Sequence, residues 1–222
     1  MPVIVVNFKN YRESLSEEGL QLARFIQAAA LEAKASVAIS PPTVMLGSVL
    51  AETKLPVFAQ HVETVKVENS TGFVTVPSLK AMGCAGSIVN HSEHRIPAEL
   101  VSESVALLRA NSLQSLVCAQ DPYEAGRLAA LGPDYVAVEP PELIGSGRAV
   151  SKVSPKVVTD SVKAVSAASP DTVPLCGAGI VDGADVRAAI ALGARGALIS
   201  SGIVKNANPY EKALELFNAL AQ

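Results

Sequence analysis

The chain has 222 residues, of which 49% are hydrophobic and 18% are charged, so it can bury a sizeable core. Its 18 basic and 21 acidic side chains give a formal net charge of −3, without the basic excess that nucleic-acid-binding domains carry. No apolar run approaches the length of a transmembrane helix, so we expect a soluble, cytoplasmic protein that binds neither nucleic acid nor membrane.

Eight short apolar runs rich in β-branched residues recur along the chain, each too short for a typical helix. Such runs are expected of strands that are buried on both faces of a parallel sheet. The predicted strands are Val3–Val6, Val37–Ile39, Val57–Ala59, Ser87–Val89, Ser115–Cys118, Tyr135–Val138, Val173–Cys176 and Ala197–Ile199.

Helical patterns separate most of these runs. Four of the helical patterns begin with proline, which suits the first position of a helix. The clearest are Glu17–Lys34, Pro97–Ala110, Pro122–Ala130, Pro155–Ala168, Gly183–Leu192 and Pro209–Leu220, whereas the stretches after the second and third strands are weaker. Strand then helix, repeated eight times over residues 1–222, predicts a single-domain (β/α)₈ barrel. A doubly wound open sheet is the alternative, but it more often has five or six strands.

Polar side chains follow three of the predicted strands, at the end where barrels carry their active sites. Asn7 and Lys9 follow the first strand, His91 and Glu93 the fourth, and Glu139 the sixth. Each alone has an ordinary structural explanation, as a surface lysine, a hydrogen-bonded histidine or an ion-paired carboxylate. Together they would meet at one mouth, where burial and mutual charge tune pKa values, and this favours a catalytic site.

The ends of the seventh and eighth strands, "CGAG" and "SSG", match the place where barrels bind phosphate through backbone N–H groups. A base (Glu139), a neutral donor (His91) and a fixed cation (Lys9) suit removal of a proton next to a carbonyl and stabilisation of the resulting enediolate. This combination predicts an enzyme that acts on a phosphorylated carbonyl compound.

The three cysteines, Cys84, Cys118 and Cys176, lie in apolar contexts and indicate small buried side chains in a reducing compartment rather than disulfides. Their spacing matches no zinc pattern. No ladder of His, Asp and Glu indicates a metal either, so we expect neither a metal nor an organic cofactor.

The motifs "NFK", "NHSEHR", "VEPPELIGSGRAVS" and "CGAGI" occur in this order along the whole chain. As a set they resemble the triosephosphate isomerase family, most closely its shorter archaeal form. The family is itself a standard example of a glutamate base working with a neutral histidine. The resemblance implies a TIM barrel and an aldose–ketose isomerase of glycolysis and gluconeogenesis, which interconverts dihydroxyacetone phosphate and D-glyceraldehyde 3-phosphate.

The resemblance also implies a role for each residue at the barrel mouth. Glu139 would move the proton between two carbons, and His91 would donate to the substrate oxygens as a neutral ring, its pKa lowered by a helix start at residues 92–95. Lys9 would offset the charge of the substrate dianion and Asn7 would hydrogen-bond to the substrate. Glu93 matches a supporting acid of the family that pairs with lysine.

The resemblance also implies that one further part of the chain closes over the substrate and that another binds the phosphate of the substrate. Residues 140–147 match the family's lid, stiffened by prolines at one end and loosened by glycines at the other, with Ile144 in the part that covers the substrate. The family's usual "YGGS" latch is "CGAG" here, so its tyrosine and serine are missing. The backbone positions that match the phosphate-binding cradle are Gly179, Ser200, Ser201 and Gly202.

Residues 60–75 form a long segment for so short a chain. It is either a surface excursion or, as the resemblance implies, a loop that inserts into a neighbouring subunit near Lys9 and Asn7, with Thr75 at its tip. The family includes dimers and tetramers, so the resemblance implies a homodimer or a homotetramer.

Two other classes of function compete with isomerisation. An epimerase or aldolase on a phosphosugar barrel would need pairs of metal-binding His and Asp residues or a lysine on the sixth strand, and the sixth strand carries Glu139 instead. A non-catalytic barrel that binds a phosphometabolite would keep the glycine-rich ends but has no need of Lys9, His91 and Glu139 together.

Overall fold

The computed structural model describes residues 2–65, 69–143 and 149–220. Within them the strands are β1 (Val3–Asn7), β2 (Ser36–Ser40), β3 (Phe58–Ala59), β4 (Gly86–Val89), β5 (Gln114–Ala119), β6 (Tyr135–Val138), β7 (Val173–Cys176) and β8 (Gly196–Ile199). They form one sheet of eight strands in the order β2-β1-β8-β7-β6-β5-β4-β3. Every described pairing is parallel.

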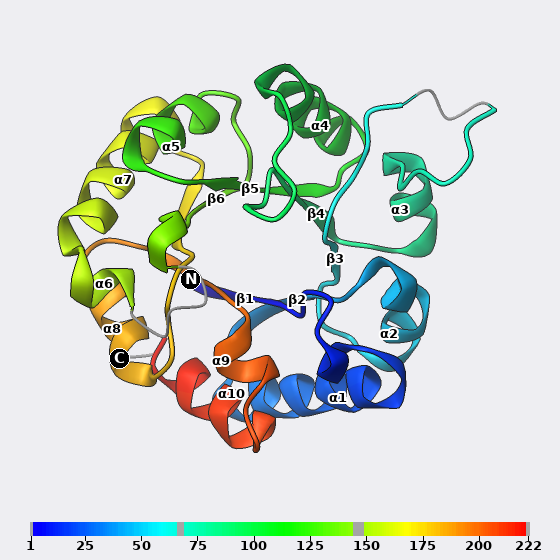
Figure 1. Cartoon of the computed structure of the whole chain (residues 1–222), viewed down its shortest axis with the longest axis horizontal. Coiled ribbons are helices and arrows are strands. Elements are labelled where there is room, and N and C mark those ends of the chain that lie inside the picture. The colour runs from blue at the N-terminus through cyan, green and yellow to red at the C-terminus, as the bar shows by residue number, and fades with distance from the viewer. Residues whose placement is uncertain (1, 66–68, 144–148, 221–222) are drawn as a thin grey trace.

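The two ends of this order meet, so the sheet closes into a barrel (Figure 1). Ile39 of β2 forms a parallel bridge with Val57, and the N–H of Ile39 donates to the carbonyl of Pro56 at 3.0 Å. The predicted strand at Val57–Ala59 is shorter in the structure, where Phe58–Ala59 form β3 and Val57 takes part in an isolated bridge, and Pro56 before it has no N–H to extend the ladder. The predicted (β/α)₈ TIM barrel is confirmed.

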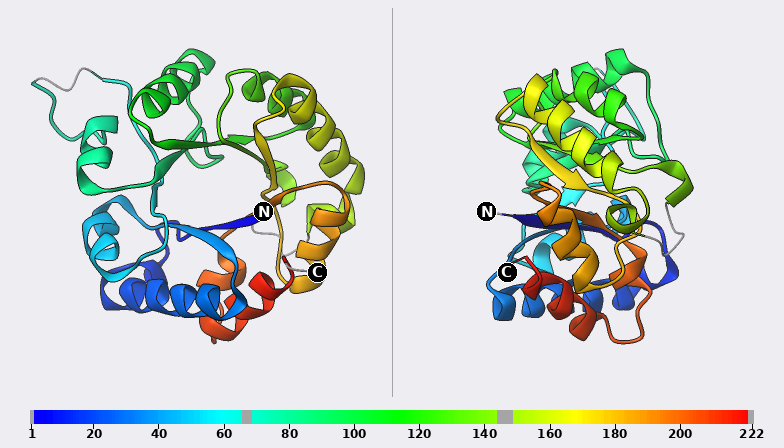
Figure 2. Two further views of the ribbon diagram at one scale, coloured as in Figure 1. Left: turned by 180° about the vertical axis from the view of Figure 1, so that it is seen from behind. Right: turned by 90° about the vertical axis from the view of Figure 1, so that its left-hand side faces the viewer.

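Helices form a ring around the strands in the front and back views (Figures 1 and 2). The described helices are α1 (Ser16–Ala33), α2 (Leu46–Glu52), α3 (Val76–Met82), α4 (Ala98–Ala110), α5 (Pro122–Ala129), α6 (Val150–Val153), α7 (Pro155–Ala168), α8 (Gly183–Ala191), α9 (Ser201–Val204) and α10 (Pro209–Asn218). The six predicted helices all occur, with ends that differ by at most two residues, and the two weak stretches form the short helices α2 and α3. Sequence periodicity missed α6 and α9, since a four-residue helix is too short to show a period.

The strands alternate between two hydrophobic layers. Their inward side chains fill the barrel, and the intervening ones, such as Ile4 and Val6 of β1, pack beneath the helices. The inward cluster comprises Val3, Val5, Ala38, Phe58, Ile88, Leu116, Cys118, Ala137, Leu175 and Leu198. Because side chains alternate along a strand, the inward row of β1 continues to Asn7, and the inward row of β6 continues to Glu139.

All three cysteines are buried and free, as the sequence predicts. None of the helices among the described residues combines the length and apolar composition needed to cross a membrane.

The segment between β3 and α3 leaves the barrel and returns to it, and its described parts extend outward past α3 in Figure 1. Glu63 and Thr75 form a bridge at its base, where the N–H of Glu63 donates to the Val74 carbonyl at 2.8 Å. The prediction that Thr75 lies at the tip is wrong. Thr75 is buried and caps the start of α3, in a reciprocal pair of hydrogen bonds with Ser78.

Phe58 tests how much stability the barrel interior contributes. It is 1% exposed and its ring contacts that of Tyr135 at 6.4 Å between centroids, whereas Phe73 is 49% exposed in the segment before α3. Phe58→Ala should lower the free energy of unfolding by about 3–5 kcal/mol. Phe73→Ala should change it by less than about 0.5 kcal/mol. Urea titrations of the two variants check this, and equal losses would contradict the assignment of Phe58 to the core.

Candidate active site

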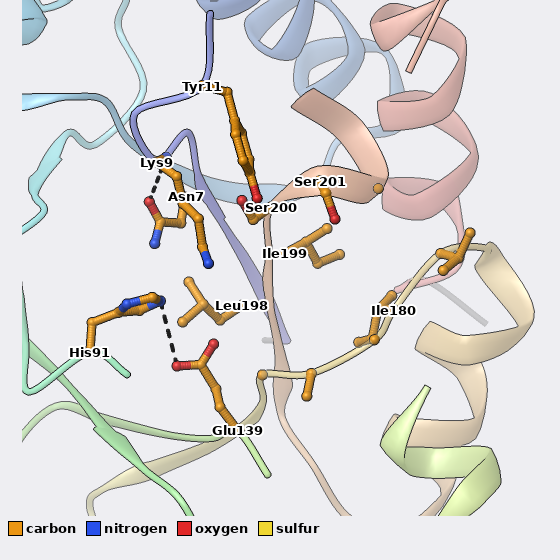
Figure 3. A pocket seen from close by; sticks show the side chains of 15 residues that line it. Asn7, Lys9, Tyr11, His91, Glu139, Ile180, Leu198, Ile199, Ser200 and Ser201 are labelled. Carbon is orange, nitrogen blue, oxygen red and sulfur yellow. Dashed lines mark hydrogen bonds and ion pairs between the residues drawn. The ribbon is translucent and has the colours of Figure 1, made fainter. Parts of the chain in front are cut away.

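Glu139 directly follows β6 and its side chain lies at the barrel mouth (Figure 3). The residue is 4% exposed, and its N–H donates to the Ala119 carbonyl at 2.8 Å. Burial raises the pKa of Glu139 to about 7, against the opposing effects of a hydrogen bond with Cys118 and the charge of Lys9. Among the described residues Oε2 has no hydrogen-bond partner. One carboxylate oxygen is therefore free to take a proton from a bound molecule.

Gly177 makes room for this carboxylate. A Cβ atom at position 177 would lie 2.4 Å from Cγ of Glu139, which is far closer than two carbon atoms can approach. The glycine that follows β7 thus serves the placement of a side chain on the neighbouring strand, in addition to any role in phosphate binding.

His91 lies opposite Glu139, with 3.7 Å between its Nε2 and Oε2 of Glu139. Its Nδ1 accepts a hydrogen bond from the N–H of Glu93 at 3.1 Å, so the ring proton resides on Nε2 and points toward the carboxylate. Burial, followed by the charge of Lys9, lowers the pKa of His91 to about 4. The ring is therefore neutral at neutral pH, and its contact with Glu139 is not an ion pair.

The predicted cause of this lowered pKa is wrong. Residues 91–94 form a turn, closed by a hydrogen bond from the N–H of His94 to the carbonyl of His91 at 2.8 Å, and α4 begins only at Ala98. None of the described helices begins at residues 92–95, and the low pKa of the ring comes from burial and from the neighbouring charges.

Lys9 completes the group from the end of β1. Its Nζ lies 3.1 Å from Oε1 of Glu93, the pairing that the motifs suggested, and this contact lowers the pKa of Glu93. The backbone of Lys9 is left-handed, with φ of 49°, and Oδ1 of Asn7 accepts its N–H at 2.9 Å. An unfavourable backbone angle held by a side chain in this way is common at functional sites.

Gly179, Ser200, Ser201 and Gly202 lie on the same cavity as Glu139, His91, Lys9 and Asn7 (Figure 3). The empty space in this cavity, including the part that opens to solvent, is about 540 Å³. A Cβ on Gly202 would lie 2.8 Å from the Ile180 carbonyl oxygen, so the turn after β7 and the start of α9 pack too closely for any larger residue. The two glycine-rich strand ends therefore form one continuous wall.

The predicted lid lies only partly within the described residues. Pro141–Leu143 form a turn of 3₁₀ helix directly after Glu139 and Pro140. Ile144, the predicted substrate-covering residue, lies outside the described residues.

Sequence reasoning missed two residues at this mouth. Gln60 donates from Nε2 to Oδ1 of Asn7 at 3.3 Å, and it could have been found because it directly follows β3. Tyr11 lines the cavity, with Nζ of Lys205 4.1 Å from the centre of its ring, and no motif or strand end marks it. Within residues 2–65, 69–143 and 149–220, no three His, Cys, Asp or Glu side chains gather as metal ligands.

Comparison with known proteins shows the same family over nearly all of the chain. A family model described as triosephosphate isomerase matches residues 2–220. The chain belongs to the triosephosphate isomerase family. A protein named triosephosphate isomerase from Cenarchaeum symbiosum is 42% identical over 220 residues, 99% of this chain and 98% of the relative.

Two further relatives of the triosephosphate isomerase family, both carrying that name, match equally widely. The one from Pyrobaculum calidifontis is 42% identical over 220 residues, covering 99% of this chain and 96% of the relative. The one from Methanocaldococcus jannaschii is 39% identical over 214 residues, covering 96% and 98%. The similarity to archaeal members that the motifs indicated is confirmed.

NMR signals of the His91 ring, followed as a function of pH, report its charge state directly. With a pKa of about 4, the ring should stay neutral above about pH 5.5. Its two ring nitrogens should therefore keep the unequal ¹⁵N shifts of a neutral imidazole between about pH 5.5 and 8, with a small change as the neighbouring Glu139 titrates near 7. The signals are assigned by their loss in His91→Gln, and the urea-unfolded chain, titrating near pH 6.5, is the control. A change of both nitrogens to the nearly equal shifts of an imidazolium, with a midpoint near about 6.5 in the folded protein, would contradict the neutral ring.

Proposed function

We propose that this chain is a triosephosphate isomerase that interconverts dihydroxyacetone phosphate and D-glyceraldehyde 3-phosphate. One observation carries the proposal. A buried carboxylate oxygen of Glu139, without a hydrogen-bond partner among the described residues, faces the Nε2 proton of a neutral His91 across 3.7 Å. Membership of the family and the names of the relatives support it.

In the proposed reaction Glu139 removes a proton from the carbon next to the carbonyl group and returns it to the neighbouring carbon. A base with a pKa of about 7 suits this cycle, because it can take the proton and give it back at neutral pH. The hydrogen bond with Cys118 and the packing on Gly177 hold the carboxylate while its other oxygen reacts.

His91 acts on the oxygens of the substrate. A neutral ring that donates from Nε2 stabilises the negative oxygen of the enediolate, and it can pass its proton between the two oxygens and recover it. The N–H of Glu93 at Nδ1 keeps this tautomer in place. An imidazolium would instead have to give up a whole proton.

Lys9, Asn7 and the glycine-rich wall bind the rest of the substrate. The ammonium of Lys9 offsets the charge of the dianion, and Asn7 hydrogen-bonds to the substrate. Backbone N–H groups at Gly179, Ser200, Ser201 and Gly202 hold the phosphate. Ile144 remains a predicted contact of the segment that covers the substrate.

We further infer that the chain forms a single domain and acts in the cytoplasm as a homodimer or homotetramer. A second hollow of about 1010 Å³, lined in part by Asn10, Thr43 and His61, adjoins the site beside Lys9. It offers space for residues 60–75 of a neighbouring copy. Sedimentation equilibrium of the purified chain separates monomer, dimer and tetramer.

The activity is tested by adding D-glyceraldehyde 3-phosphate to the purified chain and coupling the formation of dihydroxyacetone phosphate to its NADH-dependent reduction by an added dehydrogenase. We expect rapid conversion without added metal or cofactor. The absence of turnover in correctly folded protein would contradict the proposed function.

Glu139→Asp tests the role of the base in the same assay. Retracting the carboxylate by one methylene misplaces proton transfer while leaving the phosphate contacts, so kcat should fall by about 100-fold with KM changed by less than about threefold. Glu103→Asp is the control, because Glu103 is exposed on α4, outside the candidate site, and the variant should keep nearly normal kcat. A near-normal kcat in Glu139→Asp would remove Glu139 from the role of base.

A further inference from the structure

A second buried carboxylate, Asp185, lies at the start of α8, behind the turn that follows β7. Among the described residues, Glu139 and Asp185 are the acids that are buried. Oδ2 of Asp185 accepts the N–H groups of Val181 at 2.9 Å and Asp182 at 3.1 Å. The N–H of Asp185 in turn donates to Oδ1 of Asp182 at 2.8 Å. Asp185 therefore fastens the last residues of this turn to the first turn of α8.

The same turn is one wall of the candidate active site. Residues 177–181 all line the cavity, and the carbonyl of Ile180 contacts the start of α9 at Gly202. The phosphate-binding N–H groups proposed for this wall come from both segments. Their relative positions therefore depend on where Asp185 holds residues 180–182.

Three residues of the helix α6 contact this turn or the start of α8. The N–H of Val150 donates to the Ala178 carbonyl at 3.3 Å, and Oγ of Ser151 donates to the Asp185 carbonyl at 3.3 Å. Nζ of Lys152 lies 2.6 Å from Oδ1 of Asp185, and 3.5 Å from Oδ2 of Asp182. The ammonium is half exposed, whereas the carboxylate of Asp185 is 4% exposed.

Lys152 also offsets the negative charge of Asp185, in addition to linking α6 to the start of α8. A buried carboxylate without a cation is costly, and its field would oppose a dianion held by the adjacent turn. Lys152 lies on the solvent side of Asp185 and offsets that charge. The close contact with Asp185 also raises the pKa of Lys152, so the ammonium stays charged at neutral pH.

We propose that Lys152 and Asp185 are a positioning pair, which holds the turn after β7 in the geometry that binds the phosphate of the substrate. The inference rests on the proposed function. It extends that function to a pair of residues outside the cavity, acting through the backbone of Ala178–Asp182. It also gives α6 a role that no motif of the sequence indicated.

The test compares Lys152→Met, Lys152→Arg and Lys156→Met. Lys156 is the matched control, because it pairs with Asp160 on the exposed face of α7 and contacts nothing in the turn. For each protein, KM and kcat are measured with D-glyceraldehyde 3-phosphate, and the dissociation constant of inorganic phosphate is measured by equilibrium titration.

Lys152→Met should raise KM and the phosphate dissociation constant together, by about five- to tenfold, with kcat changed by less than about twofold. Lys152→Arg should recover most of the loss, because a guanidinium can also bind the carboxylate of Asp185. Lys156→Met should match the unsubstituted chain in all three values.

Three results would overturn the pairing: an unchanged phosphate dissociation constant in Lys152→Met, an equal rise in Lys156→Met, or no recovery in Lys152→Arg. The titration needs no turnover. If the phosphate dissociation constant depends on Lys152 but the chain isomerises nothing, the proposed function alone is refuted. If the chain is active but its phosphate dissociation constant does not depend on Lys152, this inference alone is refuted.

Discussion

The parallel pairing of all eight described strands is the constraint on which the site depends. Parallel strands end at the same side of a barrel, so the residues that follow them must share one mouth. Alternation of side chains then decides which of these residues point inward. Val5 leads to Asn7 on β1, and Ala137 leads to Glu139 on β6, so a shift of one residue in either strand would turn its functional side chain away. The same constraint brings Gly177 against Glu139.

Burial within this mouth acts on two titratable groups in opposite directions. It raises the pKa of Glu139 and lowers that of His91, because it disfavours the charged form of each. A base and a neutral donor at neutral pH are thus produced by one physical cause. Asp185 is equally buried, but its Oδ2 accepts hydrogen bonds from two backbone N–H groups and its Oδ1 forms an ion pair with Lys152. What distinguishes the two carboxylates is the neighbour of the oxygen that lacks a hydrogen bond: a lysine ammonium for Asp185, and a neutral histidine ring for Glu139.

Much of this arrangement was readable from the sequence. Short apolar runs predicted the strands, and the rule that barrels carry function at strand ends gathered Lys9, His91 and Glu139 from segments far apart in the chain. The residues that sequence reasoning misplaced or missed depend on contacts between distant segments. Thr75 was assigned to a loop tip, yet it lies buried at the start of α3, because its side chain caps that helix. The charge of Lys152 has meaning only beside Asp185, thirty-three residues later, and neither residue stands in a motif or at a strand end.

The central claim is that Glu139 moves a carbon-bound proton, and isomerisation in D₂O tests it most directly. While bound to a carboxylate at the barrel mouth, the proton can exchange with solvent before it returns to carbon. The D-glyceraldehyde 3-phosphate formed from dihydroxyacetone phosphate should therefore carry deuterium at carbon 2, as seen by NMR before any second turnover. Product free of deuterium at every stage of the reaction would show that the transferred hydrogen never exchanges with solvent, as in direct hydride transfer between the two carbons, and would contradict the proposed exchange at Glu139.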